Sequence, residues 1–202
     1  MNKFAFWGLV AVLGAALGWV IAMWSPTPQA VQGTEALRLA AAPTGGDFTL
    51  ESPEGPLSLR DLRGNVVLLY FGYTFCPDIC PTSLAWIAQA LSTLDEQELS
   101  RVRVLFISVD PERDTLPRLK EYAAYFHDAI IGVTGSREAI DHVARLYGAA
   151  YSRQAVDSAG GYVVDHSSFT YVISPQGALL ESLPHGTPPS QIAAAIRGAL
   201  KS

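Results

Sequence analysis

The chain has 202 residues, with 14 basic and 19 acidic side chains, and therefore a formal net charge of -5 at neutral pH. A mildly acidic chain is poorly suited to bind nucleic acid, because that function needs concentrated positive charge. Hydrophobic residues make up 49% of the sequence, and only two cysteines are present. The length and composition allow one hydrophobic core beside a membrane segment.

Residues 1–25 predict a transmembrane anchor. No charged residue occurs from Phe4 to Trp24, and a helix of this length, rising by about 1.5 Å per residue, spans a hydrocarbon core of about 30 Å. Trp7 and Trp24 stand near its ends, as interfacial aromatic residues do, and Lys3 favours a cytoplasmic N-terminus. The apolar stretch is too long for a typical cleaved signal peptide. We therefore expect a single-pass protein of a bacterial inner membrane with its C-terminal domain in the periplasm.

The rest of the chain predicts a tether and one domain. Residues 26–46 are rich in Pro, Ala, Thr and Gly without sustained periodicity, which is typical of a flexible tether. Residues 47–202 contain no internal repeat, and they are expected to form a single domain.

Strand and helix patterns alternate through this domain. This alternation predicts an α/β sheet, and an antiparallel hairpin with a Pro and Gly turn is expected over 171–180. Together the patterns indicate a thioredoxin-like domain with an added hairpin. The expected strands are 66–71, 102–109, 129–133, 170–173 and 178–182, and the expected helices are 115–126, 137–147, 189–200 and one that carries the cysteines.

The two cysteines, Cys76 and Cys80, stand where the first of these strands gives way to a helical pattern. If the segment after Cys76 is helical, residues four apart share one face, with Cβ atoms about 5 to 6 Å apart. The pair could then bind one soft metal ion, close a redox-active disulfide, or serve as a structural disulfide. A helix N-terminus favours the reactive thiolate form. In open α/β sheets the ligand site lies beyond the carboxyl ends of the strands, where these cysteines fall.

One of the four histidines, His166, is a candidate metal ligand. It lies in a loop just before the strand at 169–173, and the fold could bring it beside the cysteines. The other three, His127, His142 and His185, are expected to be ordinary helix and loop residues. Two thiolates and an imidazole form a soft set of three ligands that suits copper, as Cu(I) and, with a nitrogen present, as Cu(II), whereas structural zinc would require a fourth ligand.

Several acidic residues could support such a site. Asp165 could accept a hydrogen bond from the imidazole or simply stabilise a turn, and Asp78 could tune the charge near the cysteines. Asp110 is a candidate for partner contact or site support, with a turn role expected first. Asp114 or Thr115 is expected to cap the following helix.

Three segments together resemble the Sco/SenC family: 72–81 (GYTFCPDICP), 108–114 (SVDPERD) and 164–167 (VDHS). The resemblance implies a thioredoxin-fold copper protein that helps to assemble the dinuclear copper centre in subunit II of cytochrome c oxidase. It also implies that Cys76, Cys80 and His166 are the copper ligands. The expected partners are subunit II, a periplasmic copper donor and a thioredoxin-like reductant.

Two roles remain open, because members of this family are argued either to carry copper or to reduce the cysteines of the target. A thiol-disulfide oxidoreductase without metal is less favoured, since three residues separate the cysteines where the usual redox motif has two. Typical thioredoxins also place a cis-proline where this chain has residues 165–168. A peroxidase of the peroxiredoxin kind and a non-enzymatic binding module are further alternatives. The sequence does not decide whether the chain is an enzyme.

Overall fold

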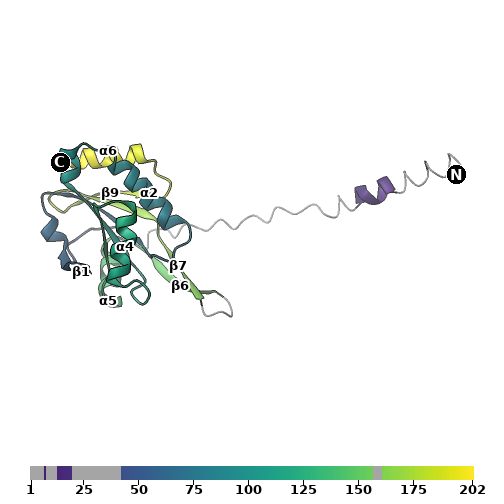
Figure 1. Cartoon of the computed structure of the whole chain (residues 1–202), viewed down its shortest axis with the longest axis horizontal. Helices are drawn as coiled ribbons and strands as arrows, with labels where there is room; N and C mark the ends of the chain where they lie inside the picture. Colours follow the sequence, from purple (N-terminus) through teal and green to yellow (C-terminus); the bar gives the residue numbers. More distant parts are fainter. Residues whose placement is uncertain (1–6, 8–12, 20–41, 157–160) are drawn as a thin grey trace. The chain divides into compact units, whose positions relative to one another are not determined.

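The structure is a computed structural model that describes residues 7, 13–19, 42–156 and 161–202. It divides the chain into two compact units, Met1–Glu35 and Ala36–Ser202. In the first unit the described residues, 7 and 13–19, are helical and exposed (Figure 1). No helix within the described ranges is both long and apolar enough to cross a bilayer. Most of the predicted anchor at 1–25 lies outside the described residues, and it stays a prediction.

The second unit begins to pack before the predicted boundary at residue 47. The backbone N–H groups of Thr44 and Gly45 both donate to the carbonyl of Leu146, at 3.0 and 2.9 Å. The hydroxyl of Tyr147 donates to the carbonyl of Gly46 at 2.9 Å. The last residues of the predicted tether are therefore bound to the domain, while residues 26–41 lie outside the described part of the chain.

The domain is built on a five-stranded mixed sheet in the order β5-β4-β3-β8-β9. Strand β3 pairs in parallel with β4, β4 in parallel with β5, and β8 is antiparallel to both β3 and β9. This arrangement confirms the α/β prediction, and β8 and β9 form the predicted hairpin. The strands are β1 (Thr49–Ser52), β2 (Gly55–Ser58), β3 (Val66–Gly72), β4 (Val102–Ser108), β5 (Ile130–Val133), β6 (Tyr151–Val156), β7 (Gly161–His166), β8 (Phe169–Ile173) and β9 (Leu179–Pro184). The helices are η1 (Leu59–Leu62), α2 (Ile79–Leu91), α3 (Glu96–Ser100), α4 (Leu116–Phe126), α5 (Arg137–Leu146) and α6 (Pro189–Ala199).

Strand β3 lies at the centre of the sheet, and all of its residues are buried. Its continuous apolar sequence is what a strand covered on both faces requires. Alternation along the strand places Tyr70 and Phe71 on opposite faces. Tyr70 stacks on Phe106 of β4, which packs against Tyr122 of α4. On the other face Phe71 contacts Tyr147 and Tyr171.

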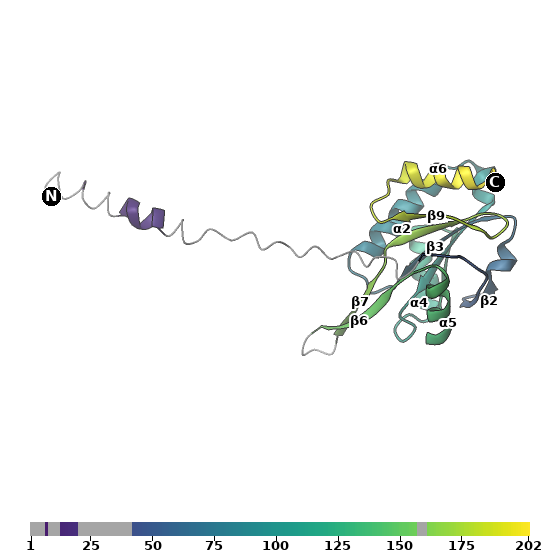
Figure 2. The ribbon, with the colours of Figure 1, turned by 180° about the vertical axis from the view of Figure 1, so that it is seen from behind.

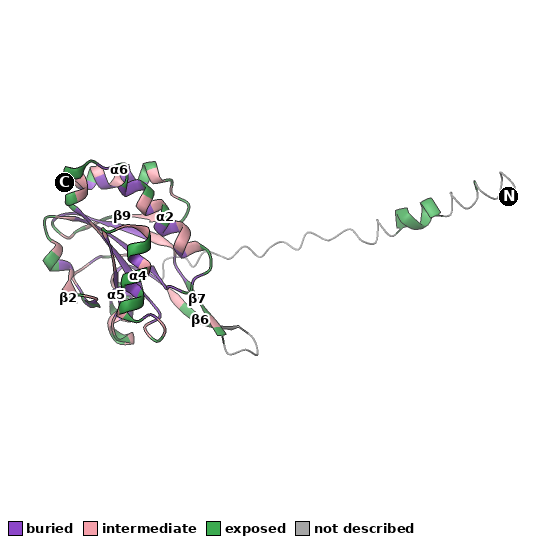
Figure 3. Cartoon of the chain, viewed as in Figure 1, coloured by how far each residue is buried: buried purple, intermediate pink, exposed green. Residues whose placement is uncertain are grey.

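The helices cover these two apolar faces. Figures 1 and 2 show α6 beside α2, and these two helices are in contact. Figure 3 shows the buried residues running along the central strands, while the outward sides of the helices are exposed. The core is therefore continuous around β3. The loop that follows β3 leaves this core at the edge of the sheet where Cys76 and Cys80 lie.

Two further hairpins, β1–β2 and β6–β7, were not predicted. Strands β6 and β7 pair in register from Tyr151 with His166 to Val156 with Gly161, and Figures 1 and 2 show this hairpin extending away from the main sheet. Its sequence has polar residues, such as Arg153 and Gln154, where a buried strand would have an apolar run. The hairpin matters for the site because it ends at His166.

The contact between α4 and β5 gives a test of the packing. A Cβ atom added at Gly132 of β5 would lie 2.7 Å from the carbonyl oxygen and 2.8 Å from the Cβ of Leu119, so the backbones approach closely there. We expect Gly132→Ala to lower the free energy of unfolding by about 1 to 3 kcal/mol, because overpacking forces a backbone shift. Gly198→Ala on α6 is the control, since nothing lies within 4 Å of its added Cβ. That change should be neutral or stabilise by up to about 1 kcal/mol. Equal urea-unfolding midpoints for the two variants would contradict this assignment.

Candidate metal and thiol site

The two cysteines do not share a helical face as the spacing suggested. Helix α2 begins at Ile79, so Cys80 lies in its first turn, while Cys76 lies in the preceding loop. The backbone N–H of Cys76 donates to the carbonyl of Tyr73 at 3.2 Å, which turns the loop back toward the helix. The residue before a proline is pushed away from helical conformation, and Pro77 follows Cys76.

His166 completes a compact group with the cysteines. Its Nε2 atom lies 3.1 Å from the sulfur of Cys80, and its Nδ1 atom lies 3.3 Å from the carbonyl oxygen of Ser167. The two sulfurs and one ring nitrogen all lie within 4.8 Å of one another. All three residues are buried, with Cys76 at 9%, Cys80 at 0% and His166 at 5% exposure. The structure thus brings together the three residues that the sequence singled out.

Aromatic rings from the central strand and its loop enclose the imidazole. Tyr70 and Tyr73 make edge-to-face contacts with His166, at centroid distances of 6.2 and 6.1 Å. A Cβ atom at Gly72 would lie 2.8 Å from the sulfur of Cys80, so only glycine lets α2 approach the strand this closely. None of these three residues was predicted to belong to the site, although their position at the end of a predicted strand was a usable signal.

The two thiols differ strongly in acidity. A hydrogen bond from Cys80 lowers the pKa of Cys76 to about 4, against the opposing effect of burial and with help from His166 and from the backbone N–H groups of Asp78 and Cys80. Burial raises the pKa of Cys80 well above its ordinary value, and the neighbouring Cys76 adds to this effect. At neutral pH the pair therefore holds one proton between its two sulfurs, with the thiolate on Cys76.

The structure places the predicted supporting acids Asp78 and Asp165 on the surface. Asp78 acts on Cys76 through its backbone N–H rather than through its carboxylate. Asp165 is exposed on β7 while its neighbour His166 is buried, as strand alternation requires. The acceptor beside the Nδ1 atom of His166 is the carbonyl of Ser167. This placement gives no support to a role of Asp165 in orienting the imidazole.

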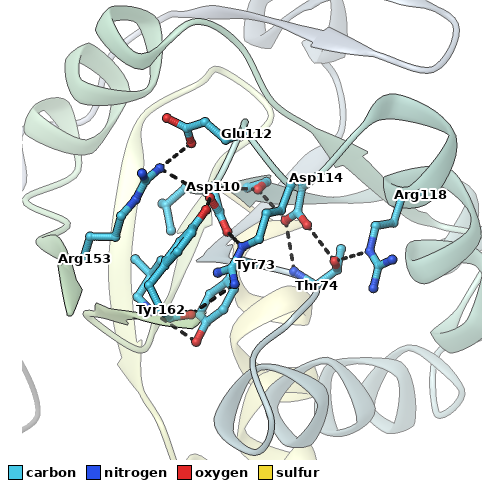
Figure 4. A network of polar contacts seen from close by, with 12 residues as sticks. Tyr73, Thr74, Asp110, Glu112, Asp114, Arg118, Arg153 and Tyr162 are labelled. Atoms are coloured by element: carbon cyan, nitrogen blue, oxygen red, sulfur yellow. Dashed lines mark hydrogen bonds and ion pairs between the residues drawn. The ribbon is translucent and has the colours of Figure 1, made fainter. Parts of the chain in front are cut away.

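Asp114 holds the cysteine loop rather than capping α4. Its carboxylate accepts hydrogen bonds from the backbone N–H of Thr74 at 2.9 Å and from its hydroxyl at 2.6 Å. It also accepts one from the hydroxyl of Ser108 at 2.6 Å (Figure 4). Thr115 occupies the N-cap position of α4 without a side-chain hydrogen bond. The buried Asp114 therefore fixes the loop just ahead of Cys76.

Asp110 ties the β6–β7 hairpin to the same loop after β4. It is fully buried, accepts a hydrogen bond from the hydroxyl of Tyr162 at 2.5 Å, and pairs with Arg113. Arg113 also donates to the carbonyl of Tyr162 at 3.0 Å, and Arg153 pairs with Glu112 at 2.6 Å (Figure 4). Burial excludes a direct partner contact for Asp110, so the structure supports its alternative role in holding the site. Tyr162 and Arg153 were not identified from the sequence.

The arrangement defines a class of protein: a thioredoxin-like domain with a buried pair of free thiols against an imidazole. Two sulfurs and a nitrogen suit a soft metal ion such as copper. A low-pKa thiol beside a second thiol also suits thiol-disulfide exchange. The group fits either chemistry.

Comparison with known proteins settles the family. Residues 38–201 match the SCO1/SenC family, and the chain belongs to it. It is 40% identical over 194 residues to the mitochondrial protein SCO2 homolog of Mus musculus, covering 94% of this chain and 76% of the relative. It is similar to the crystal structure of Arabidopsis thaliana ScoI with copper bound, with a TM-score of 0.72 and 36% identity over 78% of this chain and 98% of that one.

A second solved structure connects the fold to a cellular process. BsSco is described as a member of the Sco family of cytochrome c oxidase assembly proteins, with a disulfide switch. Its TM-score is 0.63 and its identity 26%, over 80% of this chain and 96% of that one. The comparisons confirm the Sco/SenC resemblance and the thioredoxin-like fold.

The acidity of Cys76 is testable by alkylation. Because its pKa is lowered to about 4, the reaction rate of the reduced chain with iodoacetamide should fall only as the pH drops through about 4. An ordinary thiol loses reactivity below about 8.5. Cys80→Ala removes the largest cause of the shift, so the midpoint should move upward. Mass spectrometry of the alkylated peptide identifies the site, and Cys76→Ser provides the control. A midpoint near that of free cysteine in the unaltered chain would contradict the assignment.

Proposed function

We propose that this protein is a membrane-anchored copper chaperone for the assembly of cytochrome c oxidase. It would hold one copper ion between Cys76, Cys80 and His166 and pass it to the paired thiols of the dinuclear copper centre in subunit II. The observation that carries the proposal is the meeting of these three soft donor atoms within 4.8 Å in a buried site. The copper-bound ScoI structure and the assembly role given for BsSco support it.

Each of the three residues of the site would have a different role in binding and releasing the copper ion. Cys76 offers a thiolate at neutral pH, and it is the only one of the two sulfurs whose residue retains exposure. Cys80 must release its proton when the ion binds, so loading is favoured at higher pH. His166 supplies the third donor through Nε2, because Nδ1 faces the Ser167 carbonyl. An incoming thiolate would then displace Cys76 first, one copper–sulfur bond forming as the other breaks.

A second candidate function is reduction of the cysteines of subunit II. The specific observation in its favour is the acidic Cys76 beside the buried Cys80, both free in this structure. The Cys76 thiolate would attack the disulfide of the target, and Cys80 would then release the mixed disulfide. The target gains two thiols as this pair becomes a disulfide. A thioredoxin-like reductant would have to restore it, as would be needed before copper loading.

Anaerobic copper titration of the reduced full chain tests the proposal. We expect one copper per chain and, with Cu(II), a thiolate-to-copper charge-transfer band. His166→Ala should lower the copper affinity by at least about tenfold. Even the mutation of a residue that only hydrogen-bonds to a metal ligand typically lowers metal affinity by about that factor. His142→Ala, an exposed histidine on α5, should leave binding unchanged. Absence of stoichiometric copper, or binding indifferent to His166, would contradict the copper site and favour the reductase.

We further propose that the anchor holds the domain in the periplasm of a bacterial cell, where it would meet its copper donor. The uncharged stretch after Lys3 supports this orientation. A reporter enzyme that is active only after export should be active when fused after Ser202. The same fusion lacking residues 1–25 should be inactive. Equal activity of the two fusions would refute the anchor.

A further inference from the structure

An aromatic side chain stays at the surface at the mouth of the site. Phe75 directly precedes Cys76, yet it is 46% exposed whereas Cys76 is 9% exposed. Two guanidinium groups contact its ring, that of Arg118 at 4.1 Å and that of Arg113 at 4.7 Å from the centroid. Cation–π contacts hold the ring in place without covering it.

The Arg118 side chain is also held in place by contacts with the loop of Cys76. Its Nε atom donates to the hydroxyl of Thr74 at 2.6 Å, and Thr74 is itself held by Asp114. Within the described part of the chain no carboxylate pairs with Arg118, whereas the nearby Arg113 and Arg153 both form ion pairs. Figure 4 shows the terminal nitrogens of Arg118 directed away from the Asp114 carboxylate.

We propose that Phe75 and Arg118 form a docking rim for the protein that receives copper, and that this rim binds a segment carrying a carboxylate close to its cysteine thiols. The inference rests on the proposed function and specifies the chemistry of its partner. The free fork of a guanidinium binds a carboxylate with two parallel hydrogen bonds. Arginine and aromatic side chains dominate the binding energy of many interfaces.

The existing contacts of the rim make it effective for this purpose. The hydrogen bond to Thr74 and the stacking on Phe75 already restrict the Arg118 side chain, so little rotamer entropy remains to be lost on binding. Both rim residues adjoin the loop of Cys76, the thiolate that retains exposure. A carboxylate bound to Arg118 would therefore bring the partner's thiols to the accessible side of the site.

Association measurements test the rim separately from copper chemistry. The reduced, copper-free full chain is titrated against the reduced, copper-free copper-binding domain of oxidase subunit II, labelled at its N-terminus, and fluorescence anisotropy is followed. Arg118→Met and Phe75→Ala should each raise the Kd by about tenfold. Arg118→Lys should give an intermediate value, since lysine keeps the charge and loses the fork. Arg118→Met should also reduce the dependence of Kd on salt.

Matched controls come from the same chain. Arg145→Met removes an exposed arginine of α5 that has no ion pair among the described residues, and Leu180→Ala removes an apolar side chain that is also 46% exposed. Both should bind subunit II like the unaltered chain, and copper titration of each variant verifies an intact site. Unchanged Kd values for the two rim variants, or no association of the unaltered chain, would overturn the rim. Rim variants that bind subunit II normally but lose affinity for vesicles of anionic lipid would also overturn the rim. Failure of the unaltered chain to bind copper would instead count against the proposed function.

Discussion

Two buried carboxylates on the loop after β4 hold together the segments from which the candidate ligands project. Asp114 binds the loop ahead of Cys76, and Asp110 binds Tyr162 in the hairpin that ends at His166. A carboxylate removed from water is tolerated only when its oxygens are hydrogen-bonded or paired. Each of these acids therefore requires its partner segment to stay in place. The separation between the sulfurs and the imidazole depends on this requirement, although neither acid touches the ligands through an observed hydrogen bond.

The contact between Cys80 and His166 favours a metal over simple disulfide chemistry. In a thiol-disulfide oxidoreductase the exposed cysteine attacks, and the buried one needs only to reach it. Here an imidazole nitrogen lies 3.1 Å from the buried sulfur, inside a cage formed by Tyr70 and Tyr73. Such a cage orders a nitrogen donor against the buried sulfur of Cys80, whereas disulfide exchange would gain from the imidazole only its help in lowering the pKa of Cys76. A soft metal ion would make use of the nitrogen itself, because it gains a third ligand.

The sequence predicted the sheet well, because continuous apolar runs such as that of β3 are a local signal for buried strands. It also singled out the three residues that meet in the candidate site, since Cys76, Cys80 and His166 are distinctive residue types. It failed where the result depends on packing between distant segments. The β6–β7 hairpin is stabilised by Asp110 and the arginines around it rather than by its own apolar pattern, and no local period reveals such contacts. The two cysteines do not share a helical face, because α2 begins only at Ile79 and Cys76 lies in the loop before it.

In the proposed copper carrier, the position of Cys76 in a loop would resolve a conflict between holding copper and releasing it. A site that holds copper must exclude water and competing ligands, which burial of Cys80 and His166 achieves. A site that releases copper must also expose one ligand to the thiolate of the partner. A loop residue can move without breaking the backbone hydrogen bonds of α2, whereas Cys80 cannot leave its place in the first helical turn without doing so. In the proposed carrier, retention and release would therefore fall to different cysteines. The exposed Phe75 lies beside Cys76, as does Arg118, which forms no ion pair among the described residues.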